Sequence, residues 1–325
     1  MTSLTTEAGA AGAEAPAAPA RALAAQTRGL RKVFGRTVAV DSVDLDVPAG
    51  AVVGVLGPNG SGKTTVIRML LGLCRPTAGS VSLLGASMPD GAGSVLPHVG
   101  ALVEGPGFHP FLSGRENLLR CAAFEPLLPS SRIVSTVDDA LDRVGLADAA
   151  RRAYRGYSLG MKQRLGLAAA LLVPRRLVVL DEPTNGLDPA GTREVRRIVG
   201  ELHAAGSTVL VSSHLLAEVE ATCTHVAVLQ AGVVVAQGEL AGLLAGDQPV
   251  LEVATPSVDL ALATLRAAGV PARACRGGVE AELLGTPPAA VVEALVLAGV
   301  PVSEARRRRA GLEELFAALT EEGGA

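Results

Sequence analysis

The sequence predicts an α/β fold built on a parallel sheet, followed by a smaller α+β module. Residues 177–180 are four consecutive apolar residues, which is typical of a strand covered on both faces. A helical pattern of apolar residues over 195–202 follows, and then a second apolar strand at 208–212. This alternation indicates parallel strands joined by crossover helices. The pattern changes after Gly246, so a second module is expected there.

The composition supports a protein with a substantial core and no polyanionic partner. The chain has 325 residues, of which 49% are hydrophobic and 2% aromatic, enough for one large and one smaller domain. The net charge of -3 gives no electrostatic reason to expect a nucleic-acid partner. The four cysteines form no C-x-x-C pair, which favours reduced thiols in a cytosolic protein. Charges and prolines interrupt every long apolar run, so no transmembrane helix is expected.

The first 25 residues are mostly Ala, Pro, Thr and Gly. Their first charges are Glu7 and Glu14, whereas a signal peptide needs a basic start and an unbroken apolar centre. We therefore expect a disordered tail over residues 1–25.

The first folded domain is expected over residues 26–246. It opens with short β segments separated by Gly and Pro, followed by a helix over 62–71; the β segments are 29–34, 42–47, 51–56 and 81–84. Residues 105–173 read as a helical insert. Ser113 and Glu116 form a capping box that starts one of its helices, and Gly145 stops another, over 133–144.

Residues 247–325 are expected to form an accessory module. A Thr-Pro pair, a helix and an Ala-Gly-Val-Pro turn occur twice, over 255–271 and again over 286–301. The order β-α-β-β-α-β suggests a small ferredoxin-like module, with strands near 250–254, 271–275, 279–284 and 301–305. A last helix places Leu312, Leu315, Phe316 and Leu319 on one stripe.

A phosphate-binding loop lies between a predicted strand and a predicted helix. Its amides and the helix N-terminus can surround a β-phosphate, Lys63 can reach the β- and γ-phosphates, and the Thr64 hydroxyl can bind Mg²⁺. The loop consists of Gly57, Pro58, Asn59, Gly60, Ser61, Gly62, Lys63 and Thr64.

Two adjacent acids follow the apolar strand at 177–180. Hydrolysis at a γ-phosphate needs both a metal ion and an oriented water molecule. Asp181 can hold the metal's water shell, and Glu182 can polarise the attacking water. Together with the loop, these acids predict a nucleoside triphosphatase.

Three further segments resemble the ABC ATPase family. Residues 157–164 (YSLGMKQR) resemble the ABC signature, residues 181–189 (DEPTNGLDP) look like the Walker B segment running into the D-loop, and residues 212–214 (SSH) resemble the switch histidine. The resemblance covers about residues 27–246. It implies a P-loop NTPase with a RecA-like mixed sheet core, an antiparallel β subdomain and a helical subdomain.

The resemblance also implies a mechanism. Two such domains meet head to tail, with ATP between one P-loop and the other's signature. Ser158 then donates to the γ-phosphate, while also capping its own helix. His214 holds the γ-phosphate or the water positioned by Glu182, although a histidine at a strand end can also be structural. Phe34 stacks on adenine, unless it packs inward. The implied ATP contacts are Phe34, Gly57, Pro58, Asn59, Gly60, Ser61, Gly62, Lys63, Thr64, Thr65, Glu104, Ser158, Gly160 and Asp188, and the implied metal ligands are Thr64, Asp181 and Glu104.

Two positions depart from the usual family pattern. Glu104 stands where the Q-loop normally has Gln, and Leu159 where the signature normally has Gly. These segments look like the branch of bacterial exporters for drugs, antibiotics and lantibiotics. The resemblance implies ATP and Mg²⁺ as cofactors, a separate membrane permease, a second ATPase subunit, and a place on the cytoplasmic face of the membrane. The region around 108–111 is the expected coupling surface.

Three alternatives remain open. A soluble ABC ATPase acting on DNA or ribosomes is one, although such proteins usually carry a long coiled coil or two ATPase domains. The 247–325 module could instead sense a ligand that regulates the motor. The basic run 306–309 is expected to be a solvated face, with contact to anionic lipid or a partner as its alternative.

Overall fold

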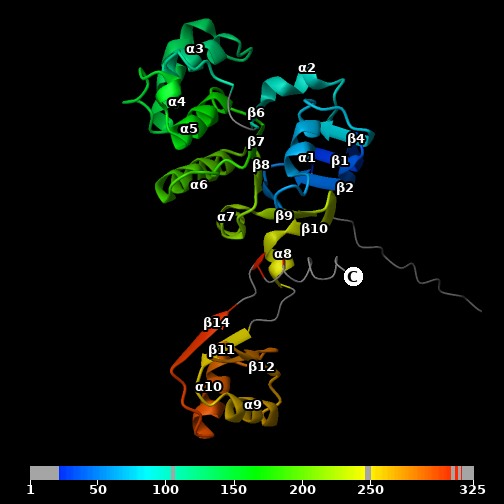
Figure 1. The fold of residues 1–325 in the computed structure, drawn as a ribbon, viewed down its shortest axis with the longest axis vertical. Coiled ribbons are helices and arrows are strands. Elements are labelled where there is room, and N and C mark those ends of the chain that lie inside the picture. Colours follow the sequence, from blue (N-terminus) through cyan, green and yellow to red (C-terminus); the bar gives the residue numbers. More distant parts are fainter. Residues whose placement is uncertain (1–21, 104–106, 246–249, 309–311, 314–315, 317–325) are drawn as a thin grey trace, which may run out of the picture.

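The computed structural model describes residues 22–103, 107–245, 250–308, 312, 313 and 316. The described chain contains three sheets with helices packed around them (Figure 1). Two sheets belong to the first domain and the third to the C-terminal module. This confirms the predicted α/β fold with a small α+β module at its end.

A six-stranded sheet in the order β10-β9-β3-β8-β7-β6 forms the centre of the first domain. Its strands are parallel except β10, which pairs antiparallel with β9. All residues of β3 and β7 are buried, as expected of strands covered on both faces. The strands are β3 (Val52–Leu56), β6 (Val99–Leu102), β7 (Leu177–Asp181), β8 (Thr208–Ser213), β9 (His225–Gln230) and β10 (Val233–Glu239).

Helices cover both faces of this sheet, and alternate strand residues point to each side. Val53 and Val179 share a buried cluster with helix α1 (Lys63–Leu70). Val178 belongs to a second cluster with helix α6 (Pro189–Ala204). Helices α7 (Leu216–Thr222) and α8 (Leu240–Ala245) follow β8 and β10. The sheet is therefore buried between α1 and α6, with its carboxyl edge left for loops.

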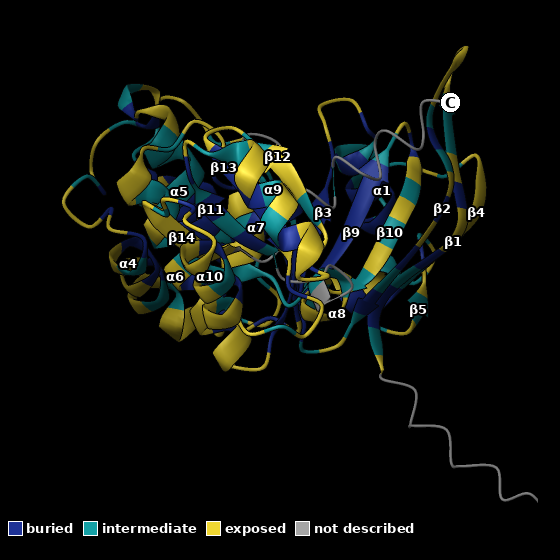
Figure 2. Ribbon diagram, turned by 90° about the horizontal axis from the view of Figure 1, so that it is seen from below, coloured by how far each residue is buried: buried dark blue, intermediate teal, exposed yellow. Residues whose placement is uncertain are grey.

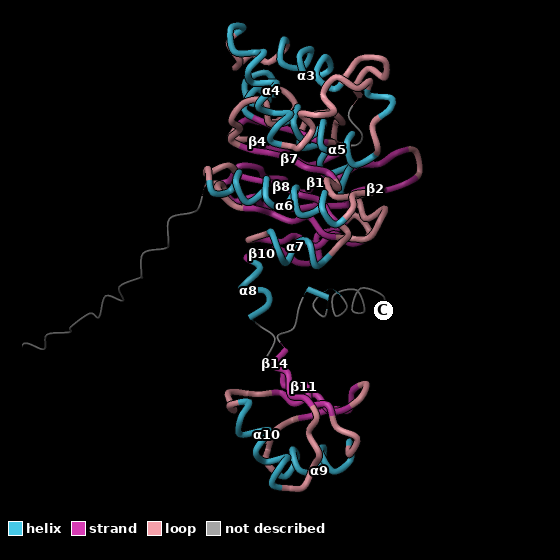
Figure 3. Tube along the Cα trace, turned by 90° about the vertical axis from the view of Figure 1, so that its left-hand side faces the viewer, coloured by secondary structure: helices cyan, strands magenta, loops and turns pink. Residues whose placement is uncertain are grey.

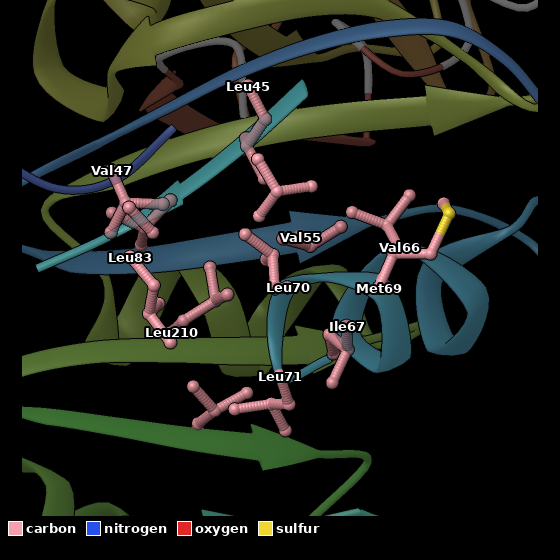
Figure 4. Close-up of a cluster of buried hydrophobic side chains, with 14 of the residues drawn as sticks. Leu45, Val47, Val55, Val66, Ile67, Met69, Leu70, Leu71, Leu83 and Leu210 are labelled. Atoms are coloured by element: carbon pink, nitrogen blue, oxygen red, sulfur yellow. The ribbon is translucent and has the colours of Figure 1, made fainter. Parts of the chain in front are cut away.

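An antiparallel sheet in the order β2-β1-β4-β5 packs over α1. Figure 4 shows Leu45, Val47 and Leu83 of this sheet facing Leu70 and Val55 across the shared core. Strand β1 begins at Leu23, so residues 23–25 belong to a strand and not to the expected tail; the strands are β1 (Leu23–Phe34), β2 (Thr37–Pro48), β4 (Ala78–Leu83) and β5 (Ala86–Ser87). The tail prediction rested on composition, whereas pairing with β2 and β4 orders these small residues.

The segment between β6 and β7 is helical in its described part. Ser113 accepts a hydrogen bond from the Glu116 N–H, and the Glu116 carboxylate accepts one from the Ser113 N–H, which confirms the capping box. Gly145 takes a φ of +63° directly after the next helix. The helices near or within this segment are α2 (Ala92–Val95), α3 (Gly114–Ala123), α4 (Ile133–Arg143) and α5 (Leu159–Ala170).

The C-terminal module has the element order β11-α9-β12-β13-α10-β14, which is the β-α-β-β-α-β order expected from the sequence. Its sheet is antiparallel throughout, in the order β12-β13-β11-β14, and Figure 3 shows the helices on one side of it. The elements are β11 (Val250–Ala254), α9 (Val258–Ala267), β12 (Ala272–Cys275), β13 (Gly278–Glu282), α10 (Pro288–Leu297) and β14 (Glu304–Arg308).

The repeat seen in the sequence is also a structural repeat. Leu265 and Leu295 occupy equivalent places in α9 and α10, and both are fully buried. Each helix ends at a glycine with positive φ, Gly269 at +72° and Gly299 at +75°. The last strand starts at Glu304 and not at 301, and just before it both the amide and the hydroxyl of Ser303 donate to the carbonyl of Ala254.

Beyond β14, the chain contacts the first domain again. Leu312 is 1% exposed and packs in a cluster with Val219 of α7 and Leu240 of α8, joined by Phe316. The Leu312 N–H donates to the carboxylate of Glu220. Leu315 and Leu319, predicted on the same stripe, lie outside the described residues.

Candidate nucleotide-binding site

The glycines of the loop between β3 and α1 allow it to fold tightly. A Cβ at Gly57 would lie 2.5 Å from the Ser61 hydroxyl oxygen. Gly62 has a φ of +104°, and a Cβ there would lie 2.7 Å from the carbonyl oxygen of Ala39. Both positions therefore require glycine, because a side chain would collide with neighbouring atoms. The loop follows β3, and Figure 2 shows that β3 and the neighbouring β9 are mostly buried.

Lys63 folds back into the loop that it follows. Its side chain is 6% exposed, and its Nζ donates to the carbonyls of Gly57 at 2.7 Å and Pro58 at 3.2 Å. The Ser61 hydroxyl is buried and has no hydrogen-bond partner among the described residues. A buried, unpaired polar atom beside a pinned ammonium group suits an anionic ligand such as a phosphate.

The two acids predicted from the sequence stand at the end of β7. Asp181 is 7% exposed, and its Oδ1 accepts a hydrogen bond of 2.5 Å from the Ser212 hydroxyl. Glu182 has a φ of +48°, in the left-handed region that residues other than glycine rarely adopt. The residue expected to activate the attacking water therefore has an unfavourable backbone conformation.

Glu182 lies between a lysine and a histidine. Its Oε1 is 3.4 Å from Lys63 Nζ, and its Oε2 is 2.7 Å from His214 Nδ1. Its side chain is 20% exposed and that of His214 is 36% exposed, so solvent reaches both. Lys63, Glu182 and His214, which the sequence analysis placed in one site, thus meet at one carboxylate although they come from three separate segments.

The signature residues lie elsewhere in the same chain. Ser158 caps α5, and its hydroxyl accepts a hydrogen bond of 3.2 Å from the Met161 N–H. Ser158 and Leu159 are exposed. Figures 1 and 2 place α5 and α1 on opposite sides of the central sheet, so the structure does not bring the signature to its own P-loop.

Leu159, which replaces the usual signature glycine, packs against the D-loop of its own chain. Gly186 has a φ of +72°, and a Cβ there would collide with the Leu159 Cδ2. A Cβ at Gly160 would likewise lie 3.1 Å from Leu187. The side chain of Leu159 is therefore accommodated by a glycine in the D-loop. Asp188 follows and caps α6, with its Oδ1 accepting from the Gly191 N–H at 2.8 Å.

The structure describes three of the other predicted site residues but not the fourth. Phe34 ends β1 and is 48% exposed, so it is available for stacking instead of packing inward. The Nζ of Lys32 lies 5.0 Å from the centre of its ring. Thr64 and Thr65 lie in the first turn of α1, directly after Lys63. Glu104, predicted to be an ATP contact and a metal ligand, lies outside the described residues.

Two features of the site, the Ser212 hydroxyl bond to Asp181 and the Lys63–Glu182 contact, were not predicted from the sequence. Ser212 is paired in register with Asp181 across β7 and β8, and it is fully buried. Its place at the end of an apolar strand indicated that the Ser212 hydroxyl is buried, and a buried hydroxyl needs a polar partner. The Lys63–Glu182 contact had no such signal, since it depends on the order of strands in the sheet.

This chain is similar in sequence to proteins of one known family. Residues 40–185 match the family described as "ABC transporter". The Daunorubicin resistance ATP-binding protein DrrA3 of Streptomyces coeruleorubidus is 37% identical, over 90% of this chain and 94% of that protein. The Bacitracin transport ATP-binding protein BcrA of Enterococcus faecalis is 42% identical, over 64% of this chain and 66% of that protein. The chain belongs to the ABC transporter family.

A solved ATP-binding subunit of an ABC transporter has a similar fold. It is 28% identical to this chain, covers 69% of it and 93% of its own length, and gives a TM-score of 0.63. The ABC family and this fold make the chain an ATP-binding P-loop ATPase, as the motifs predicted. None of the described helices combines the length and the apolar character that a membrane span needs.

Proposed function

We propose that this chain is the ATP-hydrolysing subunit of an ABC exporter for a drug, antibiotic or peptide, working with a separate membrane permease. The observation that carries the proposal is the Glu182 carboxylate held between Lys63 and His214 at the phosphate-binding loop. Relatives named for bacitracin transport and daunorubicin resistance support the direction and the class of cargo.

In the proposed reaction, the loop amides and Lys63 bind the β- and γ-phosphates of ATP. Lys63 Nζ lies near Glu182 in this structure, so the lysine exchanges a carboxylate for a phosphate when ATP enters. Glu182 is thereby released to accept a hydrogen bond from the attacking water, and His214 orients that carboxylate through its 2.7 Å contact.

Mg²⁺ fits the oxygen donors at this site. Thr64 offers a hydroxyl at the start of α1, and Asp181 a carboxylate at the end of β7. Oxygen ligands of this kind suit Mg²⁺, which keeps several waters when it binds with phosphates. When bound, the ion would neutralise charge on the phosphates, while the protein groups position ATP and water.

We further propose that two copies assemble to complete each site. Ser158 and Leu159 are exposed on a helix remote from the P-loop of the same chain. A second ATPase subunit would present its Ser158 at the start of α5, where amides and the helix dipole favour an anion. The exposed Phe111, beside Arg155, lies in the region proposed to contact the permease.

The substitution Glu182→Gln tests the proposed base. We expect turnover to fall by about 100- to 10,000-fold, because an amide cannot accept the proton. ATP binding should persist, and a stable dimer should accumulate with ATP by gel filtration. Glu293→Gln on the outward face of α10 makes the same chemical change away from the site and should leave turnover unchanged. Turnover at the original rate in Glu182→Gln contradicts the assignment.

Purification from detergent-solubilised membranes tests the transporter role. A polytopic membrane protein should co-purify with the tagged chain, and it should remain bound through a high-salt wash. Recovery of ribosomes or DNA in its place would support a non-transport role and would contradict the proposed function.

A further inference from the structure

One buried hydroxyl connects the two acids of the proposed site. The Ser212 hydroxyl donates to Asp181 Oδ1 at 2.5 Å and accepts from the Glu182 N–H at 2.9 Å. Ser212 is 0% exposed. A serine hydroxyl has one proton and two lone pairs, so it can make both bonds at once. Neither acid can then shift without breaking a bond to the same atom.

The sheet places this hydroxyl where the bonds require it. Strands β7 and β8 are parallel, and Asp181 is the register partner of Ser212. Paired residues on neighbouring strands point to the same face, so the two side chains are adjacent. The next residue, Glu182, lies beyond the last pair of the ladder, and its amide is satisfied by the Ser212 side chain in place of a backbone carbonyl.

The backbone at Glu182 makes this bond important. A φ of +48° is unfavourable for glutamate, and such a conformation persists only where the surroundings hold it. The turn directs the carboxylate to Lys63 and His214. Without an acceptor for its amide, Glu182 could relax toward an extended conformation, and its carboxylate would leave the phosphate-binding loop.

We propose that Ser212 is a positioning residue for ATP hydrolysis, which holds the Asp181 carboxylate and the strained backbone of Glu182 in one arrangement. It acts through these two acids and not on ATP itself. This inference rests on the proposed function, because it assumes that Glu182 positions the attacking water.

The test is Ser212→Ala in the full chain, with its membrane partner if turnover requires it. We expect kcat to fall by about 10- to 100-fold, the effect of losing one or two buried hydrogen bonds to charged or strained groups. The KM for ATP and the equilibrium binding of a fluorescent ATP analogue without Mg²⁺ should change by less than about threefold, because the P-loop contacts remain. Binding of the analogue with Mg²⁺ should weaken more, because Asp181 loses its orienting donor.

Ser207→Ala is the matched control. Ser207 is 8% exposed and precedes β8 at its other end, where its hydroxyl donates to the carbonyl of Arg175 at 2.7 Å. The control removes a buried serine hydroxyl with one hydrogen bond. It should therefore lower the melting temperature about as much as Ser212→Ala does, but leave kcat within about twofold of that of the original protein.

Two results overturn the proposal. One is a folded Ser212→Ala protein with kcat within about twofold of the original, and the other is a loss of kcat equal to that of Ser207→Ala. If Ser212→Ala does not fold, Ser212→Cys gives the same comparison, since the thiol fills the space but is a weak donor. If Glu182→Gln abolishes turnover while Ser212→Ala does not reduce it, the positioning role fails and the proposed function stands.

Discussion

Two arginine–glutamate pairs, one in each part of the molecule, join the same groups in different surroundings. In the ATPase domain, Arg175 Nη2 lies 2.6 Å from Glu125, and both side chains are buried, at 6% and 9% exposed. In the C-terminal module, Arg273 Nη2 also lies 2.6 Å from Glu280; the glutamate is 10% exposed, but the arginine is 78% exposed. Equal distances therefore do not imply equal energies, because water reaches the arginine of the second pair and neither partner of the first.

The pairs also differ in what they connect. Glu125 follows α3 and is 50 residues from Arg175 in the sequence, so that pair joins the helical segment to the start of β7. Arg273 and Glu280 are 7 residues apart on neighbouring strands of one hairpin. The first pair therefore joins two distant segments of the ATPase domain, whereas the second joins the two strands of one hairpin in the module.

The largest expected effect comes from Arg175→Met. This change leaves the buried Glu125 carboxylate without its charged partner, and it also frees the carbonyl of Pro97, which accepts from Arg175 Nη1 at 2.6 Å. We expect the free energy of unfolding to fall by about 3–5 kcal/mol, as for other broken buried pairs. Urea denaturation followed by circular dichroism measures it.

The double variant Arg175→Met/Glu125→Leu should recover most of that loss, because it removes the unpaired charge. If Arg175→Met costs no more than about 1 kcal/mol, burial does not separate the two pairs, and the comparison fails.

Leu265→Ala and Leu295→Ala test the repeat within the module. Both leucines are 0% exposed and lie in equivalent turns of α9 and α10. Each substitution should destabilise the module by about 2–5 kcal/mol, and the two values should agree within about 1 kcal/mol because the environments match. Differential scanning calorimetry would show whether the module unfolds separately, and a large inequality would mean that the halves are not equivalent in packing.

Leu312→Ala tests the contact between the segment after β14 and the ATPase domain. Leu312 is 1% exposed against Val219 and Leu240, so its loss should cost about 1.5–3 kcal/mol. The substitution should lower the unfolding temperature of the ATPase domain, because Leu312 packs on α7 and α8 of that domain. The conservative Leu312→Met should cost less than about 1.5 kcal/mol. An effect confined to the module would contradict the packing of Leu312 on α7 and α8.

The smallest effect is expected for Arg273→Gln. The Glu280 carboxylate is 10% exposed, but the arginine is 78% exposed and its guanidinium is screened by water, so the loss should stay below that of Arg175→Met, at about 1 kcal/mol, and should shrink further in high salt. Thermal unfolding at low and high ionic strength measures this. A loss as large as that of Arg175→Met would show that exposure does not govern these pairs.

Those parts of the protein that are built by neighbouring residues can be predicted from short stretches of sequence. The P-loop, the acids after β7 and the capping box at Ser113 follow from local residue order, because each is made by neighbours within a few positions. The duplicated pattern of the module likewise predicted its element order.

The contacts between distant groups, in contrast, depend on the folded arrangement of the strands. The position of Ser212 opposite Asp181, the contact of Glu182 with both Lys63 and His214, and the return of Leu312 to α7 all depend on strand order and packing. A local pattern indicates at most that a buried hydroxyl such as that of Ser212 needs a partner, and not which one, since residues from separate segments become neighbours only when the whole sheet has assembled. For the same reason the start of β1 at Leu23 was missed: its small residues are ordered by strands that lie elsewhere in the chain.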